Sequence, residues 1–227
     1  MEYQIQGGNL PVVLCTLQAG DSMYTESGGM SWMTTNIGME TNMKGGLMKG
    51  LARKLAGESL FMTTYSCQQG QGLIAFSSSF PGEIRAIKLE AGQSLICQKR
   101  SFLAAEGSVT LEMHFRKRLG VGLFGGEGFI LQKITGPGMA FVEMDGSVIE
   151  YDLQAGQVLK VDTGHVAMFD PTVNFDIQTV KGFSNVLFGG EGLFLGTLTG
   201  PGKVWLQTMP FENLANEIIA RVPKSSS

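Results

Sequence analysis

The feature that most constrains the fold is an internal repeat. The heptapeptides LFGGEGF (123–129) and LFGGEGL (187–193) differ at one residue and lie 64 positions apart. At the same offset, GEGFILQKITGPGMAFVE (126–143) aligns with GEGLFLGTLTGPGKVWLQ (190–207). A more distant third copy, GESLFMTTYSCQQGQGLIAF (57–76), has QQGQG in place of the GPG turn. Similarity at a steady period indicates that one structural unit occurs several times.

A second motif repeats in the same order. LQAGD (17–21), LEAGQ (89–93) and LQAGQ (153–157) each follow an apolar run typical of a strand. Glycine accepts the positive φ that branched residues resist, so these motifs predict turns between strands. We therefore predict one compact body of three pseudo-equivalent repeats with a tail. The predicted boundaries are 1–81, 82–145 and 146–210 for the repeats, and 211–227 for a C-terminal helix and tail.

Short alternating runs predict five or six strands in each repeat. In the segment 167–180, Val173, Phe175 and Ile177 share one face, and the polar residues between them share the other. The stretch ILQKITGPGMAFVEM predicts two strands joined as a hairpin, because glycine and proline supply the backbone angles of a tight turn. These patterns predict an all-β fold of three tandem β repeats.

Two segments have the periodicity of a helix. A short helix is expected near 44–56, where leucine recurs every fourth residue. A second is expected in the C-terminal segment, where Leu214, Ile218 and Val222 form one stripe. We expect this second helix to cap the open end of the last repeat.

Composition favours an assembling β protein. Hydrophobic residues make up 43% of the 227 residues and charged residues only 16%, against roughly 25% in typical soluble domains. Such sparse surface charge favours a homo-oligomer over an isolated monomer. The net charge of −3 argues against nucleic acid as a partner, because nucleic-acid binding normally leaves a basic footprint.

Cysteine usage and the N-terminal residues favour a cytoplasmic protein. Cys15, Cys67 and Cys97 have no CxxC spacing, which predicts reduced, partly buried thiols. The start MEYQIQGGNLPVVL has neither the basic region nor the apolar core of a secretory signal. No apolar run approaches the ~20 residues that a membrane-spanning helix needs.

No pattern in the sequence predicts a catalytic site, a metal or a cofactor. GVGLFG (120–125) matches the dinucleotide fingerprint GxGxxG, but a strand-like run follows it where that motif requires a helix. His114 and His165 lie at non-equivalent places in different repeats, and there is no GxSxG nucleophile motif. The glutamates of the repeated GE motif have a structural interpretation, as turn carboxylates, and a functional one, as a carboxylate ring for a cation or acid/base chemistry. We favour the structural one.

Two sets of residues stand out as candidates. Basic and apolar residues precede the GE motifs, a combination that suits an anionic membrane surface or an acidic protein partner. The alternative is that they pack between repeats or are simply solvated. The contact candidates are Lys49, Arg53, Lys54, Arg116, Lys117, Arg118, Lys181, Phe124 and Phe188. The repeated structural signature consists of Glu58, Glu127, Glu191, Gly136, Gly138, Gly200 and Gly202.

At LAGESLF, LFGGEGF and LFGGEGLF, with the paired TGPG turns, the chain resembles the altered-inheritance-of-mitochondria twenty-four family, in particular its uncharacterised prokaryotic members. The resemblance spans nearly the whole chain. It implies a double-stranded β-helix type of fold, like that of the ring-forming tryptophan RNA-binding attenuation protein, and a homo-oligomeric ring such as a trimer. It brings no catalytic residues.

Three functions remain open on the sequence. The first is a non-enzymatic oligomeric β-scaffold or binding protein that contacts a membrane surface or protein partner through its basic and apolar loops. The second is RNA or small-ligand binding, by analogy with the attenuation-protein fold alone. The third is a cupin-like metal enzyme, which ranks last because such sites gather two or three histidines and this chain has only His114 and His165.

Overall fold

The structure is a computed structural model that describes residues 1–26, 28–42, 62–117, 128–179 and 194–222. Nearly all of its regular elements are strands, and one α-helix, α2 (Phe211–Ile219), follows the last of them. The predicted all-β class and C-terminal helix are confirmed. The helix expected near 44–56 lies outside the described residues.

The strands of the first repeat are β1 (Glu2–Gln6), β2 (Val12–Gln18), β3 (Ser22–Glu26), β4 (Trp32–Met33), β5 (Ile37–Asn42), β6 (Met62–Cys67) and β7 (Gln71–Ser77). The second repeat contains β8 (Gly82–Leu89), β9 (Ser94–Gln98), the 3-10 turn η1 (Lys99–Ser101), β10 (Phe102–Glu106), β11 (Thr110–Lys117), β12 (Phe129–Thr135) and β13 (Gly138–Asp145). The third contains β14 (Val148–Leu153), β15 (Val158–Asp162), the 3-10 turn η3 (Thr163–His165), β16 (Val166–Phe169), β17 (Asn174–Thr179), β18 (Phe194–Thr199) and β19 (Gly202–Gln207).

The same series of six strands therefore occurs three times, as β2–β7, β8–β13 and β14–β19. Between the second and third series, η1 and η3 are separated by 64 residues, the same offset as the sequence motifs. β1 has no counterpart in the other two series, and it lengthens the first sheet by pairing with β2.

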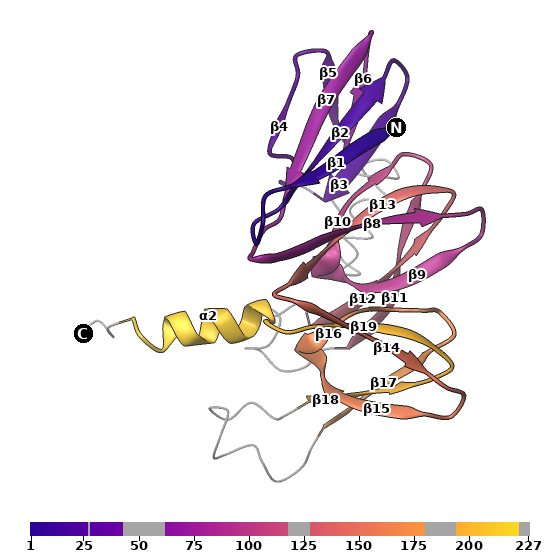
Figure 1. Ribbon diagram of the computed structural model, residues 1–227, viewed down its shortest axis with the longest axis vertical. Helices are drawn as coiled ribbons and strands as arrows, with labels where there is room; N and C mark the ends of the chain where they lie inside the picture. Colours follow the sequence, from indigo (N-terminus) through magenta and orange to yellow (C-terminus); the bar gives the residue numbers. More distant parts are fainter. Residues whose placement is uncertain (27, 43–61, 118–127, 180–193, 223–227) are drawn as a thin grey trace.

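The described strands form four antiparallel sheets that are stacked along the long axis of the molecule (Figure 1). Their strand orders are β1-β2-β7-β4, β5-β6-β3-β10-β13-β8, β11-β12-β9-β16-β19-β14 and β15-β18-β17. Each repeat contributes its first, third and sixth strands to one sheet and its second, fourth and fifth strands to the next. Every repeat is thus a two-layered sandwich.

Successive repeats are joined within the two inner sheets. The second strand of one repeat pairs with the third strand of the following repeat, as β3 with β10 and β9 with β16. Ala105 is opposite Tyr24 in the first of these joints, and Phe169 is opposite Ile96 in the second. These are the same positions of the repeat, so the two joints have the same register.

Three hydrophobic cores fill the spaces between the four sheets. The inner sheets are covered on both faces, and several of their central strands are buried almost continuously, as in β13 and β16. In the outer sheets burial alternates, as in β2, because only one face is covered. The predicted alternation in β17 is confirmed, since Val173 and Ile177 are buried while Asn174 and Asp176 are exposed.

The hairpin predicted at TGPG was wrong. β12 belongs to the third sheet and β13 to the second, and β18 and β19 are divided in the same way, so the chain changes sheet at each TGPG. The pattern of apolar residues places a strand on a buried face, but it does not say which neighbour the strand pairs with. In both cases the Gly–Pro peptide bond, Gly136–Pro137 or Gly200–Pro201, is cis.

The LxAGQ and TGPG turns meet at one corner of the second repeat and at the equivalent corner of the third. In the second repeat the Gly136 N–H donates to the Gln93 carbonyl at 3.0 Å, and in the third the Gly200 N–H donates to the Gln157 carbonyl at the same distance. A Cβ at Gly136 would lie 2.6 Å from the carbonyl oxygen of Leu89, so only glycine fits where the two turns touch. The motifs recur together because each is packed against the other.

The last letter of the LxAG(Q/D) motif also has a structural role. The side chains of Asp21, Gln93 and Gln157 each accept a hydrogen bond from the backbone N–H three residues earlier, at 2.9–3.0 Å. The bond closes the turn on itself, in the manner of an Asx-type turn. This part of the signature serves local structure in all three repeats.

Candidate functional site

Most of the basic and apolar contact candidates lie outside the described residues. These are Lys49, Arg53, Lys54, Arg118, Phe124, Lys181 and Phe188. Of the two that are described, Lys117 donates from Nζ to the carbonyl oxygen of Ile177 at 2.5 Å, which ties β11 to β17. Arg116 is half-buried on the same strand. A role of this set in contacting a partner or membrane stays a prediction.

The signature residues divide in the same way. Glu58, Glu127 and Glu191 lie outside the described residues, so neither interpretation of these glutamates is tested. The four signature glycines lie at the corners described above. Gly138 and Gly202 have φ of +136° and +142°, and a Cβ at Gly202 would lie 2.6 Å from the Thr172 hydroxyl oxygen. Both observations support the prediction that these residues shape the backbone.

The two histidines have different surroundings. His165, in η3, contacts the carbonyl oxygen of Gln207 through Nδ1 at 2.7 Å. His114 lies on β11, where it lines a hollow in the surface. Within the described ranges, no group of three or more His, Cys, Asp or Glu side chains gathers as metal ligands would. Cys15, Cys67 and Cys97 are free and buried, and burial raises the pKa of Cys15 to about 12.

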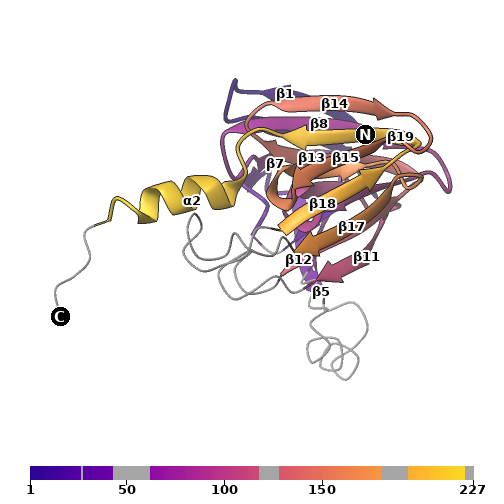
Figure 2. The ribbon, with the colours of Figure 1, turned by 90° about the horizontal axis from the view of Figure 1, so that it is seen from below.

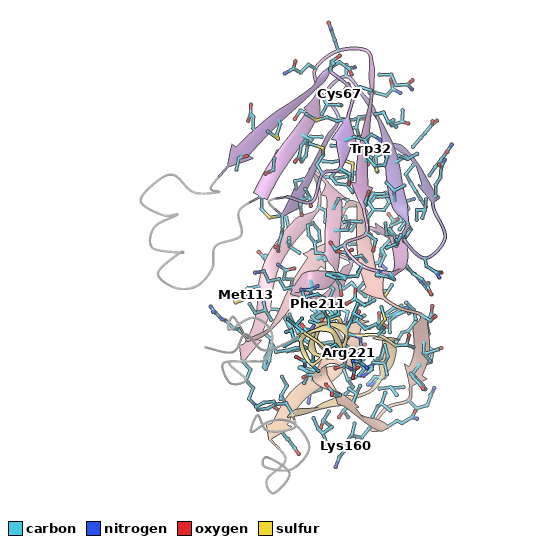
Figure 3. All side chains as sticks on the ribbon, turned by 90° about the vertical axis from the view of Figure 1, so that its left-hand side faces the viewer. Trp32, Cys67, Met113, Lys160, Phe211 and Arg221 are labelled. Atoms are coloured by element: carbon cyan, nitrogen blue, oxygen red, sulfur yellow. The ribbon has the colours of Figure 1, made fainter. Side chains whose placement is uncertain are left out.

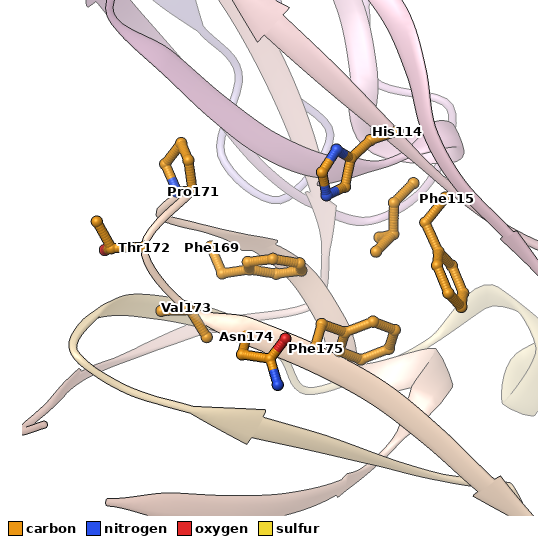
Figure 4. A pocket seen from close by; sticks show the side chains of 9 residues that line it. His114, Phe115, Phe169, Pro171, Thr172, Val173, Asn174 and Phe175 are labelled. Atoms are coloured by element: carbon orange, nitrogen blue, oxygen red, sulfur yellow. The ribbon is translucent and has the colours of Figure 1, made fainter. Parts of the chain in front are cut away.

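The hollow lies between the third and fourth sheets (Figure 4). It has a volume of ≈310 Å³. Its floor is aromatic: Phe175 stacks on Phe169 at 5.6 Å between ring centroids and meets the edge of Phe115 at 5.8 Å. The other residues that line it are His114, Leu131, Pro171, Thr172, Val173 and Asn174.

A β-bulge directs His114 toward this hollow. The pairing of β11 with β12 shifts between Met113 and Phe115, so His114 is the extra residue. A bulge of this kind re-aims a side chain. The counterpart strands β5 and β17 pair without a shift, so the bulge is specific to the second repeat among these strands.

At each end of the stack, the described strands leave one edge without a neighbouring strand. β4 is the edge of the first sheet and the counterpart of β10 and β16, which are both paired with a preceding repeat. β15 is the edge of the fourth sheet and the counterpart of β3 and β9, which are both paired with a following repeat. Figure 3 shows Trp32 of β4 and Lys160 of β15 toward opposite ends of the molecule.

The exposed side chains at these edges occupy positions that are buried in the inner sheets. Trp32 is 49% exposed, whereas its counterparts Ala104 and Met168 are buried. Lys160 is exposed, whereas its counterparts Tyr24 and Ile96 are 3% and 1% exposed. The first and fourth sheets therefore each end in a strand, β4 or β15, whose counterparts in the inner sheets have a neighbouring strand on both sides.

Helix α2 does not cap the end of the last repeat, contrary to the expectation from its sequence. It projects sideways from the stack (Figures 1 and 2). Its base is held by Phe211, whose ring lies 4.4 Å from that of Phe80 and 4.0 Å from the Arg100 guanidinium, and whose N–H donates to Asp145 at 3.1 Å. The apolar residues Ile218, Ile219 and Val222 are more than half exposed.

Sequence reasoning missed one recurrent structural contact. The side chains of Thr34, Glu106 and Asp170, each at the end of the third strand of a repeat, accept a hydrogen bond from the sixth strand's N–H at 2.7–3.0 Å. The three residue types differ, and their only shared property is a side-chain oxygen acceptor. A search for repeated letters could not find them.

Among the described residues, no helix is long and apolar enough to span a membrane. The family model described as "Mitochondrial biogenesis AIM24" matches residues 3–209. An uncharacterised protein of Streptococcus pyogenes serotype M6 is 31% identical over 225 residues, which cover 96% of this chain and 89% of that protein. A Streptococcus pyogenes protein of known crystal structure superposes with a TM-score of 0.78 at 26% identity, over 97% of this chain and 99% of the other.

Proposed function

The chain belongs to the mitochondrial biogenesis AIM24 family, and from this premise we propose that it is a non-enzymatic scaffold that assembles head to tail. The fourth sheet of one copy pairs through β15 with β4 of the next copy. A structural role is supported by the repeated signature, whose described glycines and turn residues shape corners.

The observation that carries the proposal is the equivalence of the open edges with the two internal joints. Adding β4 of a second copy to β15 gives the order β17-β18-β15-β4-β7-β2-β1, which repeats the order of the two inner sheets with one further strand. An unpaired strand edge is a template for another strand. Here the template and its complement lie at opposite ends of the same chain.

The internal joints also fix the expected register. Both place equivalent residues of the repeat opposite each other, Ala105 opposite Tyr24 and Phe169 opposite Ile96. The corresponding residues at the open edges are Met33 and Lys160. We therefore expect Met33 of one copy to lie opposite Lys160 of the next in an antiparallel pair.

A contact between two different surfaces of one chain closes into a ring or continues as a filament. The family resemblance favours a closed ring, and a trimer of the 24.4 kDa chain would have a mass of about 73 kDa. The outer sheets would then become inner sheets. Trp32 would be covered as Ala104 and Met168 are.

The test is a pair of cysteines at the expected register. Residues opposite each other in an antiparallel pair have Cα atoms about 4.5–5.5 Å apart, within reach of a disulfide. The variant with Met33→Cys and Lys160→Cys should cross-link between copies under mild oxidation, and its ladder on a non-reducing gel should stop at three chains. The three native cysteines are buried, which keeps the background low.

The matched control replaces Lys160→Cys by Val158→Cys, two residues away on the same exposed face of β15. Efficient cross-linking only in the first variant supports the register. Equal cross-linking in both, or a clean 24.4 kDa monomer by light scattering at micromolar concentration, would overturn the assembly. A ladder that runs past three chains would replace the ring by a filament.

A further inference from the structure

We propose that the hollow between β11 and β17 binds a small, uncharged planar ring compound that carries an amide-type edge. The site lies within one chain, between its third and fourth sheets, and none of its lining residues belongs to β4 or β15. It is therefore independent of the head-to-tail assembly. Either inference can fail while the other holds.

The floor of the hollow suits the face of a ring. Phe169 is 1% exposed and is held by the surrounding core, and Phe175 stacks on it with an interplanar angle of 27°. Phe129, which is fully buried, supports Phe175 from below at 5.5 Å. Offset stacking and edge contacts with such rings stabilise a bound aromatic ring beyond the burial of its area.

The rim supplies hydrogen-bonding groups that have no partner within the described part of the chain. Figure 4 shows the His114 ring directed toward Phe169 and Phe175, with the Asn174 amide on the opposite side and Thr172 along the wall. No hydrogen bond engages the side chains of these three polar residues among the described ranges. An asparagine amide both donates and accepts, which matches the paired donor and acceptor of an amide edge.

The imidazole of His114 favours an uncharged ligand. Burial, and then the nearby charge of Lys133, lower the pKa of His114 from its ordinary value of 6.5. At neutral pH the ring is therefore neutral and can act as one donor and one acceptor. A carboxylate would find no cationic partner in the side chains that line the hollow.

The size of the hollow sets the size of the ligand. Its ≈310 Å³ is at the lower end of the roughly 300–1,000 Å³ typical of ligand pockets. One ring with one short substituent fits this space. An apolar floor with a few placed polar groups is also the usual composition of such sites.

The experiment uses nicotinamide as the probe and saturation-transfer NMR on the full chain as the readout. We expect a saturable signal with a Kd in the millimolar range. Asn174→Ala and His114→Ala should each weaken binding about fivefold, the loss expected when one neutral hydrogen bond worth about 1 kcal/mol is removed. Thr172→Trp should abolish the signal by filling the hollow.

Two comparisons make the result specific. Asn213→Ala, at an exposed asparagine of α2, is the matched control and should bind nicotinamide as the parent chain does. Cyclohexanecarboxamide keeps the amide but lacks an aromatic face, and benzoate keeps the ring but carries a charge. Both should bind at least fivefold more weakly than nicotinamide.

The proposal is overturned by any of three results. The first is no saturable nicotinamide signal up to about 10 mM. The second is unchanged binding in both Asn174→Ala and His114→Ala. The third is binding of cyclohexanecarboxamide or benzoate that equals or exceeds that of nicotinamide, because the ring floor and the neutral rim would then play no part.

Discussion

The two inner sheets and the two outer sheets are made from equivalent strands, yet they differ in one respect. In the inner sheets, the strand that begins a joint and the strand that completes it belong to successive repeats of the same chain. In the outer sheets, β4 and β15 are the equivalent strands, but no other described strand pairs with their outer edges. The difference is the basis of the proposed assembly, in which β15 of one copy would pair with β4 of the next.

The largest expected effect comes from placing the same charge at equivalent positions of an inner and an outer sheet. Ala104→Asp should lower the free energy of unfolding by roughly 3–5 kcal/mol, because it buries a carboxylate without a partner. Trp32→Asp, at its half-exposed counterpart, should change that free energy by about 1 kcal/mol or less and dissociate the assembly. Urea unfolding measures the first quantity, and light scattering measures the second.

A smaller effect is expected from making β15 resemble β9. Lys160→Ile introduces the residue that occupies this position in the inner sheet, where Ile96 is 1% exposed. Because the assembled edge would no longer bury an ammonium group, the concentration at which the oligomer half-dissociates should fall about tenfold, which corresponds to ~1.4 kcal/mol. Analytical ultracentrifugation over a dilution series gives this value.

The control for that change is Lys88→Ile, at a lysine whose side chain is 77% exposed on β8. It raises the apolar surface by the same amount away from the joint. If both variants strengthen association equally, the gain reflects nonspecific hydrophobic association. The equivalence between the outer and inner joints would then lose its support.

The smallest expected effect distinguishes the two linkers between successive repeats. Glu143 accepts hydrogen bonds from the N–H of Ser79 at 2.7 Å and from the hydroxyl of Ser78 at 3.1 Å, in the linker between the first two repeats. Beside the linker between the second and third repeats, the equivalent residue is Gln207, whose neutral side chain accepts a hydrogen bond from the Asp145 N–H at 3.0 Å. The residue at this position is therefore ionisable beside the first linker and neutral beside the second.

Burial, with a further contribution from the charge of Asp145, raises the pKa of Glu143 above its ordinary value of 4.5. The folded chain therefore holds this proton more tightly than the unfolded chain. Its stabilising contribution is complete below about pH 4.5 and is lost as the pH rises through the raised value. Burial also raises the pKa of the neighbouring Asp145, and the charge of Arg100 opposes that shift.

Glu143→Gln should accordingly raise the Tm by about 2–4 °C at pH 7.5, for roughly 1 kcal/mol in a chain of this size, and leave it unchanged at pH 4.5. Thermal unfolding across that range is the measurement. Glu150→Gln is the control, because a hydrogen bond from Arg85 lowers the pKa of Glu150 and the sign is opposite. An equal gain at both pH values would point to packing and not to ionisation.

The number and order of the repeats could be predicted from the sequence because their corners use particular residue types. Glycine is required at Gly136 and Gly200, where the two turns of a repeat touch, and these requirements leave repeated letters. The alternation in β17 was visible for a similar reason, since it reflects which face is buried. Both signals depend on side chains.

The exchange of strands between sheets could not be predicted, because backbone pairing requires no particular residue types and so leaves no repeated motif in the sequence. The wrong hairpin at TGPG and the unforeseen joints of β3 with β10 and β9 with β16 have this common cause. The hollow was missed because its parts come from β11, β12, β16, β17 and the segment between β16 and β17, and the bulge at His114 brings an imidazole to it. A bulge depends on register, which one sequence does not reveal.

The joints have a last consequence for how such a chain can vary in length. Tyr24 and Ile96 differ in size and polarity, yet they hold one position in the two internal joints, since the coupling is made by amide and carbonyl groups that every residue has. A gene could therefore gain or lose a whole module, or start at a different one, without evolving a new matching surface. In the proposed ring, the number of modules per polypeptide and the number of polypeptides per assembly would be interchangeable ways of reaching the same circumference.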